Sequence, residues 1–117
     1  MFFVDRMAAV LKPTDVFLAW LQQYDEDFAD LTLAQLRANC SVFLLPVFEM
    51  PEEAVAYVGE RYRALFAAEL ASWSIDEADF PQPFDLAQFW SFFELEIHDI
   101  VLDLEEAQWQ GSAVMDE

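Results

Sequence analysis

The sequence is poor in the residue types that build common catalytic sites. Its 117 residues include one cysteine, one histidine and two glycines. A lone cysteine cannot form an internal disulfide, which favours a reducing compartment. With only Gly59 and Gly111 the chain has no glycine-rich loop to cradle a phosphate, and its serines lie in no Gly-x-Ser-x-Gly context. These absences argue against nucleotide binding and phosphoryl transfer.

Long hydrophobic runs are also missing. The longest apolar run without a charge, residues 38–48, is far shorter than the ~20 residues that a membrane-spanning helix needs. The apolar start of the chain is interrupted by Asp5 and Arg6 and lacks the basic leader of a secretory signal. We therefore expect a soluble, cytoplasmic protein that does not bind membranes.

Positive charge is scarce. Five Lys and Arg oppose 23 Asp and Glu, which gives a formal net charge of −18. All five cations precede residue 64, where ten acids accompany them, whereas the remaining thirteen acids have no cation among them. Binding to nucleic acid or to anionic lipid depends on Lys and Arg, so the sequence argues against both as direct partners. A basic partner, or solubility alone, fits this charge.

Hydrophobic residues, by contrast, are abundant. They make up 56% of the chain, and aromatic residues make up 16%. This composition excludes disorder over most of the length, and 117 residues suffice for one core without a disulfide or metal. We expect a single domain over residues 1–117, with residues 111–117 as a frayed tail.

Periodicity and capping residues predict four helices. Thr14 and Asp85 are candidate N-caps, and Thr32 with Gln35 has the spacing of a capping box. Gly59 lies inside the longest predicted helix and suggests the close approach of another backbone. The predicted helices cover residues 14–24, 32–39, 51–73 and 86–92.

Three strands are expected, over residues 6–12, 40–45 and 94–104. Residues 40–45 are apolar on both alternating faces, which is typical of a central strand covered on both sides. Residues 94–104 also fit a helical stripe, but their β-branched residues favour a strand. The order predicts an α+β domain, a small antiparallel or mixed sheet of about three strands packed with four helices.

Four stretches, AAVLKPTDVFLAWL, SVFLLPVFE, AELASW and FWSFFELEIHDIVLDL, together resemble a family of small acidic bacterial proteins of unknown function. The likeness extends over nearly the whole chain and rests on hydrophobic pattern and aromatic positions. It implies an extended segment around EIHDIVLDL. It brings no activity, ligand or catalytic residue.

Candidate chemistry is sparse. Glu94, Glu96 and His98 would share one face of the last strand, where they could bind a divalent metal or perform acid–base chemistry. The ordinary interpretation, a solvated face with a hydrogen-bonded histidine, is favoured. Cys40 could act as a nucleophile beside His98, but its apolar setting is more typical of a small buried residue. We expect neither an enzyme nor a cofactor.

Partner binding is the remaining hypothesis. The loop over residues 74–84 places phenylalanines beside carboxylates, a combination suited to a basic, apolar groove, unless both rings fold back over the core. The candidate partner-binding residues are Asp76, Glu77, Asp79, Phe80, Phe84 and Trp90.

The favoured function is accordingly a non-catalytic protein–protein interaction domain with a protein partner that is basic. One alternative is a DNA mimic that occupies a basic DNA-binding protein. Another is a small metal- or Cys-dependent enzyme. A homodimer could form through the last strand if that strand has an open edge.

Overall fold

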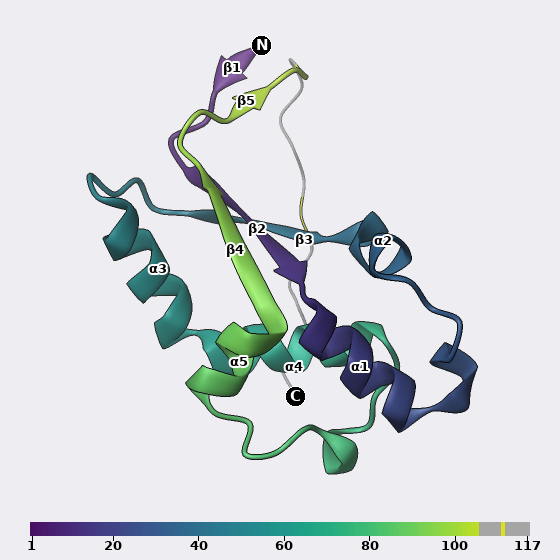
Figure 1. Cartoon of the computed structure of the whole chain (residues 1–117). Helices are drawn as coiled ribbons and strands as arrows, with labels where there is room; N and C mark the ends of the chain where they lie inside the picture. Colours follow the sequence, from purple (N-terminus) through teal and green to yellow (C-terminus); the bar gives the residue numbers. More distant parts are fainter. Residues whose placement is uncertain (106–110, 112–117) are drawn as a thin grey trace.

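The computed structural model describes residues 1–105 and 111 and confirms an α+β fold (Figure 1). The strands are β1 (Phe2–Phe3), β2 (Met7–Pro13), β3 (Ser41–Leu45), β4 (Phe93–His98) and β5 (Leu102–Asp103). The α-helices are α1 (Asp15–Tyr24), α2 (Leu33–Leu36), α3 (Pro51–Glu60), α4 (Tyr62–Ser72) and α5 (Leu86–Phe92). Short 3₁₀ turns are η1 (Glu26–Phe28), η2 (Arg37–Asn39) and η3 (Glu77–Asp79).

Three antiparallel strands form the main sheet in the order β3-β2-β4. Strand β2 is central, and its alternate residues Met7, Ala9 and Leu11 are buried. They form the inner face of the sheet, together with Phe93 of β4 and Leu45 of β3. Because successive side chains of a strand point to opposite faces, the intervening residues form an outer face.

An aromatic core lies beneath the inner face. The fully buried Phe66 of α4 contacts four other phenylalanines, with ring centroids 4.6–5.8 Å apart. Phe17 of α1 stacks on Phe92 at 5.2 Å. Helices α1, α4 and α5 gather at one end of the sheet, and the β1–β5 ribbon projects from the other end (Figure 1). The partners of Phe66 are Phe84, Phe89, Phe92 and Phe93.

The predicted capping signals are confirmed at two helices, whereas Thr14 precedes α1 without a side-chain capping bond. Thr32 Oγ1 accepts a hydrogen bond from the Gln35 amide at 3.1 Å, and Gln35 Oε1 accepts one from the Thr32 amide at 2.9 Å. Asp85 caps α5 by accepting from the Gln88 amide at 2.9 Å. Each bond satisfies an amide that the first helical turn leaves without a partner.

The single long helix predicted over residues 51–73 is wrong. The chain forms α3 and α4 with a break at Arg61 (φ −110°, ψ 13°). The Arg61 amide bonds to the Val58 carbonyl, and the Arg61 guanidinium donates to the Tyr57 carbonyl that the tighter turn leaves free. The break inserts no residue, so the buried positions Ala54, Val58, Phe66 and Leu70 keep their spacing. Periodicity therefore could not reveal it.

The prediction of a central strand over residues 40–45 is also wrong. Strand β3 is an edge strand of the three-stranded sheet. Phe43 and Leu45 face the core, whereas Val42 and Leu44 are 62% and 52% exposed on the outer face. An apolar pattern on both faces indicated burial, but here one apolar face meets solvent.

The strand predicted over residues 94–104 forms as two pieces. Strand β4 pairs with β2, the chain bends at Asp99, and β5 then pairs with β1, an element that was not predicted.

The close backbone approach expected at Gly59 is not found among the described residues. The atoms within 4 Å of the position that a Cβ would take belong to the side chains of Leu86 and Trp90. Of the predicted frayed tail, residues 112–117 lie outside the described residues.

Candidate functional site

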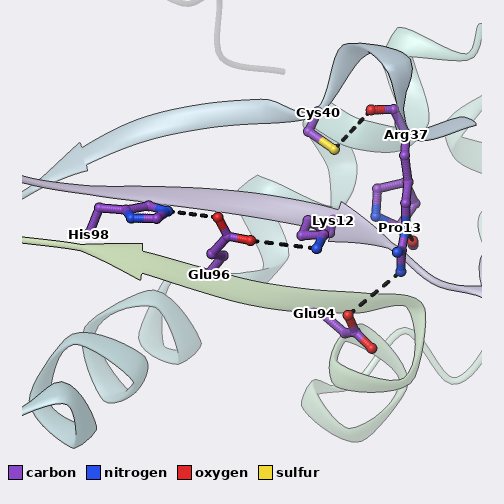
Figure 2. Close-up of polar contacts among 7 residues, drawn as sticks. All are labelled: Lys12, Pro13, Arg37, Cys40, Glu94, Glu96 and His98. Carbon is purple, nitrogen blue, oxygen red and sulfur yellow. Dashed lines mark hydrogen bonds and ion pairs between the residues drawn. The ribbon is translucent and has the colours of Figure 1, made fainter. Parts of the chain in front are cut away.

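Glu94, Glu96 and His98 share the outer face of β4, as the alternation predicts (Figure 2). Each carboxylate has a basic neighbour. His98 Nε2 lies 2.7 Å from Glu96 Oε1, and Lys12 Nζ lies 3.5 Å from Glu96 Oε2. Arg37 Nη2 lies 3.6 Å from Glu94 Oε2. The row therefore combines two surface ion pairs with a hydrogen bond between Glu96 and His98, and contacts of this kind add little to stability.

The electrostatics of this row follow from those contacts. The hydrogen bond with His98, with a smaller effect of Lys12, lowers the pKa of Glu96 below its usual 4.5. The ionised carboxylate is thus favoured in the fold. The stabilisation of the folded state by the ionised Glu96 carboxylate is present above pH 4.5, and it is lost as the pH falls through the folded-state pKa. Within residues 1–105 and 111, no group of three His, Cys, Asp or Glu side chains has the arrangement of a metal site.

Cys40 lies far from this histidine. Its thiol donates to the Arg37 carbonyl at 3.3 Å (Figure 2). The next residue, Ser41, pairs with Leu11, whereas His98 pairs with Ala8 across β2. The two sites are therefore separated by roughly 10 Å along the strands and by two strand spacings, roughly 10 Å more. The pairing needed for an activated thiolate, about 3 Å between sulfur and imidazole, is not formed.

A surface hollow lies where the ends of α1 and α4 meet. It has a volume of about 420 Å³ and adjoins a second depression of about 290 Å³. Tyr24 lines both, so we call the combined feature the Tyr24 hollow. Its aromatic and acidic lining residues are Trp20, Tyr24, Phe28, Trp73, Asp25, Asp27 and Asp79, joined by Gln23, Ser72 and Ser74.

Ring packing fixes the walls of the Tyr24 hollow. Trp20 and Tyr24 stack with centroids 5.2 Å apart, one turn apart on α1. Phe28 of η1 meets Trp73 edge-to-face at 5.7 Å. Trp20, Phe28 and Trp73 are partly buried and Tyr24 is exposed, so the rings hold one another in place while remaining accessible. Offset and edge-on arrangements of this kind are the preferred geometries of aromatic pairs.

Carboxylates surround the tyrosine. Tyr24 Oη donates to Asp79 Oδ2 at 3.0 Å, which joins α1 to the 74–84 loop. The hydrogen bond to Asp79, partial burial and the nearby charges of Asp79 and Asp76 raise the pKa of Tyr24 above 10.0. Asp25 accepts from the Asp27 amide at 2.9 Å and so caps η1. Negative charge thus accumulates beside exposed ring edges and faces.

The partner-binding candidates divide into two groups. Phe80, Phe84 and Trp90 pack against the core, Phe84 stacking on Phe66 and on Phe80. Asp76, Glu77 and Asp79 are exposed, and Asp79 belongs to the Tyr24 hollow. Both loop phenylalanines therefore fold back over the core, the alternative left open by the sequence.

Sequence reasoning did not single out the Tyr24 hollow. Trp20, Tyr24 and Phe28 follow the helical stripe that predicts a buried face, and nothing local indicates that Trp73 reaches Phe28. The acidic run over residues 25–27 was the available signal, because it continues this stripe directly.

Comparison with known proteins adds no assignment. No protein-family model, curated protein or solved structure matches this chain. No helix within the described part of the chain is both long and apolar enough to cross a membrane.

Proposed function

We propose that this protein is a non-catalytic protein–protein interaction domain that binds a basic segment of another protein at the Tyr24 hollow. The observation that supports it is the combination of accessible aromatic rings with carboxylates that form no ion pair with Lys or Arg in the described part of the chain. Ion pairs among the described residues join Lys12, Arg37 and Arg61 to glutamates elsewhere, and none reaches the hollow.

The chemistry of the hollow fits a Lys or Arg side chain. A cation within about 6 Å of a ring face is attracted to it, by about 0.5–1 kcal/mol at exposed sites. Carboxylates at the rim add a charge-assisted hydrogen bond to the same group. Tyr24 and Trp73 supply rings, and Asp25, Asp27 and Asp79 supply acceptors. The net charge of −18 steers a basic segment toward the domain before contact.

Binding to a short peptide of mixed sequence containing Lys and Arg tests the proposal. Asp25→Asn with Asp27→Asn removes two charges from the hollow while retaining the capping acceptor. Glu52→Gln with Glu53→Gln, exposed on the first turn of α3, removes the same charge elsewhere and is the matched control. We expect calorimetry to show roughly three- to tenfold weaker binding for the first pair only.

Mapping by NMR completes the test. Peptide-induced shifts should cluster at residues 24–28 and 72–79, and Tyr24→Leu should weaken binding because it removes a ring. If the Asp25/Asp27 variant and the Glu52/Glu53 control lost peptide affinity equally and Tyr24→Leu had no effect, net charge alone would drive binding. That result would contradict the proposal and favour the DNA-mimic alternative, for which aromatic rings are irrelevant.

A further inference from the structure

We propose that the free edge of β3 pairs with β3 of a second copy of this chain, forming a homodimer with one continuous six-stranded sheet. This inference is independent of the Tyr24 hollow, because it rests on a different edge of the molecule.

The outer edge of β3 is unpaired among the residues that the structure describes. Strand β3 pairs with β2 on one side only, and no further backbone hydrogen bond involves it among those of the described residues. Alternate residues of an antiparallel edge strand direct both N–H and C=O outward. Such edges are normally blocked by charge, proline or a bulge. Here no charged residue occurs over residues 38–48, and Pro46 only follows the strand.

The opposite edge of the sheet is unsuited to self-pairing. Strand β4 carries Glu94 and Glu96 on its exposed face. Two copies of β4 in antiparallel register would bring carboxylates together across the interface, and like charges on directly opposed residues are destabilising. The dimer expected through the last strand is therefore less favourable than one through β3.

Side chains of β3 are self-complementary about Phe43. A two-fold axis at this residue places Val42 opposite the partner's Leu44, and Ser41 opposite the partner's Leu45. Val42 and Leu44 are 62% and 52% exposed and adjoin Val10 and Ala8 of β2 on the outer face. Pairing would join the two apolar patches into one and shield the exposed apolar side chains of the strand.

The carboxylates of β4 and Glu69 stay well separated between the two copies in this geometry. The two β4 strands would lie five strand spacings apart, roughly 24 Å, beyond the ~8 Å screening length at physiological salt. Glu69 lies beside this strand, where its carboxylate neighbours the Ser41 hydroxyl. The two-fold axis separates the two Ser41 residues by four positions along the strand, roughly 14 Å.

Sedimentation equilibrium of the full chain over a range of protein and salt concentrations tests the dimer. We expect a monomer–dimer equilibrium that strengthens with salt, because salt screens repulsion between two copies that each carry −18. Val42→Lys and Leu44→Glu should each weaken it by about tenfold or more. Ile100→Lys, at a side chain 72% exposed in the bend between β4 and β5, is the matched control and should leave the equilibrium unchanged.

Mixing the two variants tests the register. In the proposed pairing, position 42 of one copy lies opposite position 44 of the other. Equimolar mixing of Val42→Lys with Leu44→Glu therefore places an ammonium group opposite a carboxylate and should restore dimers. Three results would each overturn the inference: a monomer at every protein and salt concentration, an equal loss of dimer affinity in Ile100→Lys, or a mixture of the two variants that stays monomeric.

The dimer and the peptide-binding proposal can fail separately. Salt should weaken the binding of a basic peptide at the Tyr24 hollow, whereas it should strengthen the dimer.

Discussion

Replacing Ser74 with glycine should stabilise the protein. Ser74 follows α4 with a positive φ of 61°, in the left-handed region. Its amide bonds to the Ala71 carbonyl at 2.9 Å, and the next amide, of Ile75, bonds to the Leu70 carbonyl at 3.2 Å. These two bonds define a Schellman motif, completed by the apolar side chains of Ile75 and Leu70, both buried. Glycine is the usual residue at this position.

Two opposing effects set the change in the free energy of unfolding that Ser74→Gly should cause. The left-handed conformation costs an L-residue about 1–2 kcal/mol, which glycine avoids. Glycine in turn loses about 0.5–1 kcal/mol more backbone entropy on folding. The net gain for Ser74→Gly is therefore about 0.5–1 kcal/mol. A chain of 117 residues has an unfolding entropy of roughly 0.25 kcal/mol per degree, so Tm should rise by about 2–4 °C.

Thermal and urea unfolding followed by circular dichroism measure this change. The matched control is Ser72→Gly, the same substitution inside the last turn of α4, where the Ser72 hydroxyl donates to the Glu69 carbonyl. A glycine there should cost up to about 1 kcal/mol. We therefore expect Ser74→Gly to raise the free energy of unfolding and Ser72→Gly to lower it. Destabilisation by both, with Ser74→Ala no worse than Ser74→Gly, would refute the left-handed cap.

Three further predictions concern the core and the titrating groups. Phe66→Ala should lower the free energy of unfolding by about 3–5 kcal/mol in urea, whereas Phe3→Ala, 81% exposed, should change it by less than about 0.5 kcal/mol; similar losses would contradict the core packing. Asp79→Asn should lower the pKa of Tyr24 toward 10.0, as measured by ultraviolet titration, because it removes the carboxylate that accepts the phenol's hydrogen bond; an unchanged titration would exclude that contact. Burial raises the pKa of Glu69 above 4.5, so its contribution to stability is present below pH 4.5 and is lost as pH rises through the folded pKa. Glu69→Gln should therefore raise Tm at neutral pH and not at pH below 4.5, and a gain independent of pH would refute this explanation.

Local signals predicted the secondary structure well where neighbouring residues decide it. The Thr32–Gln35 capping box and the Asp85 cap are interactions across three residues, so their spacing alone identifies them. The change from α5 to β4 near Phe93 likewise follows a change in hydrophobic period. The break at Arg61 was missed because it inserts no residue, so the hydrophobic period continues unchanged from α3 into α4.

The sequence alone determined the charge, the order of the main helices and strands and the alternation that aligns Glu94, Glu96 and His98. Those features depend on residue type and on spacings of two to four positions. Tertiary structure decided which strand is central, which apolar face stays in solvent and which distant residues form the Tyr24 hollow. These outcomes depend on contacts such as Tyr24 with Asp79, 55 positions apart. No local pattern encodes them, because they are set by which elements pack together.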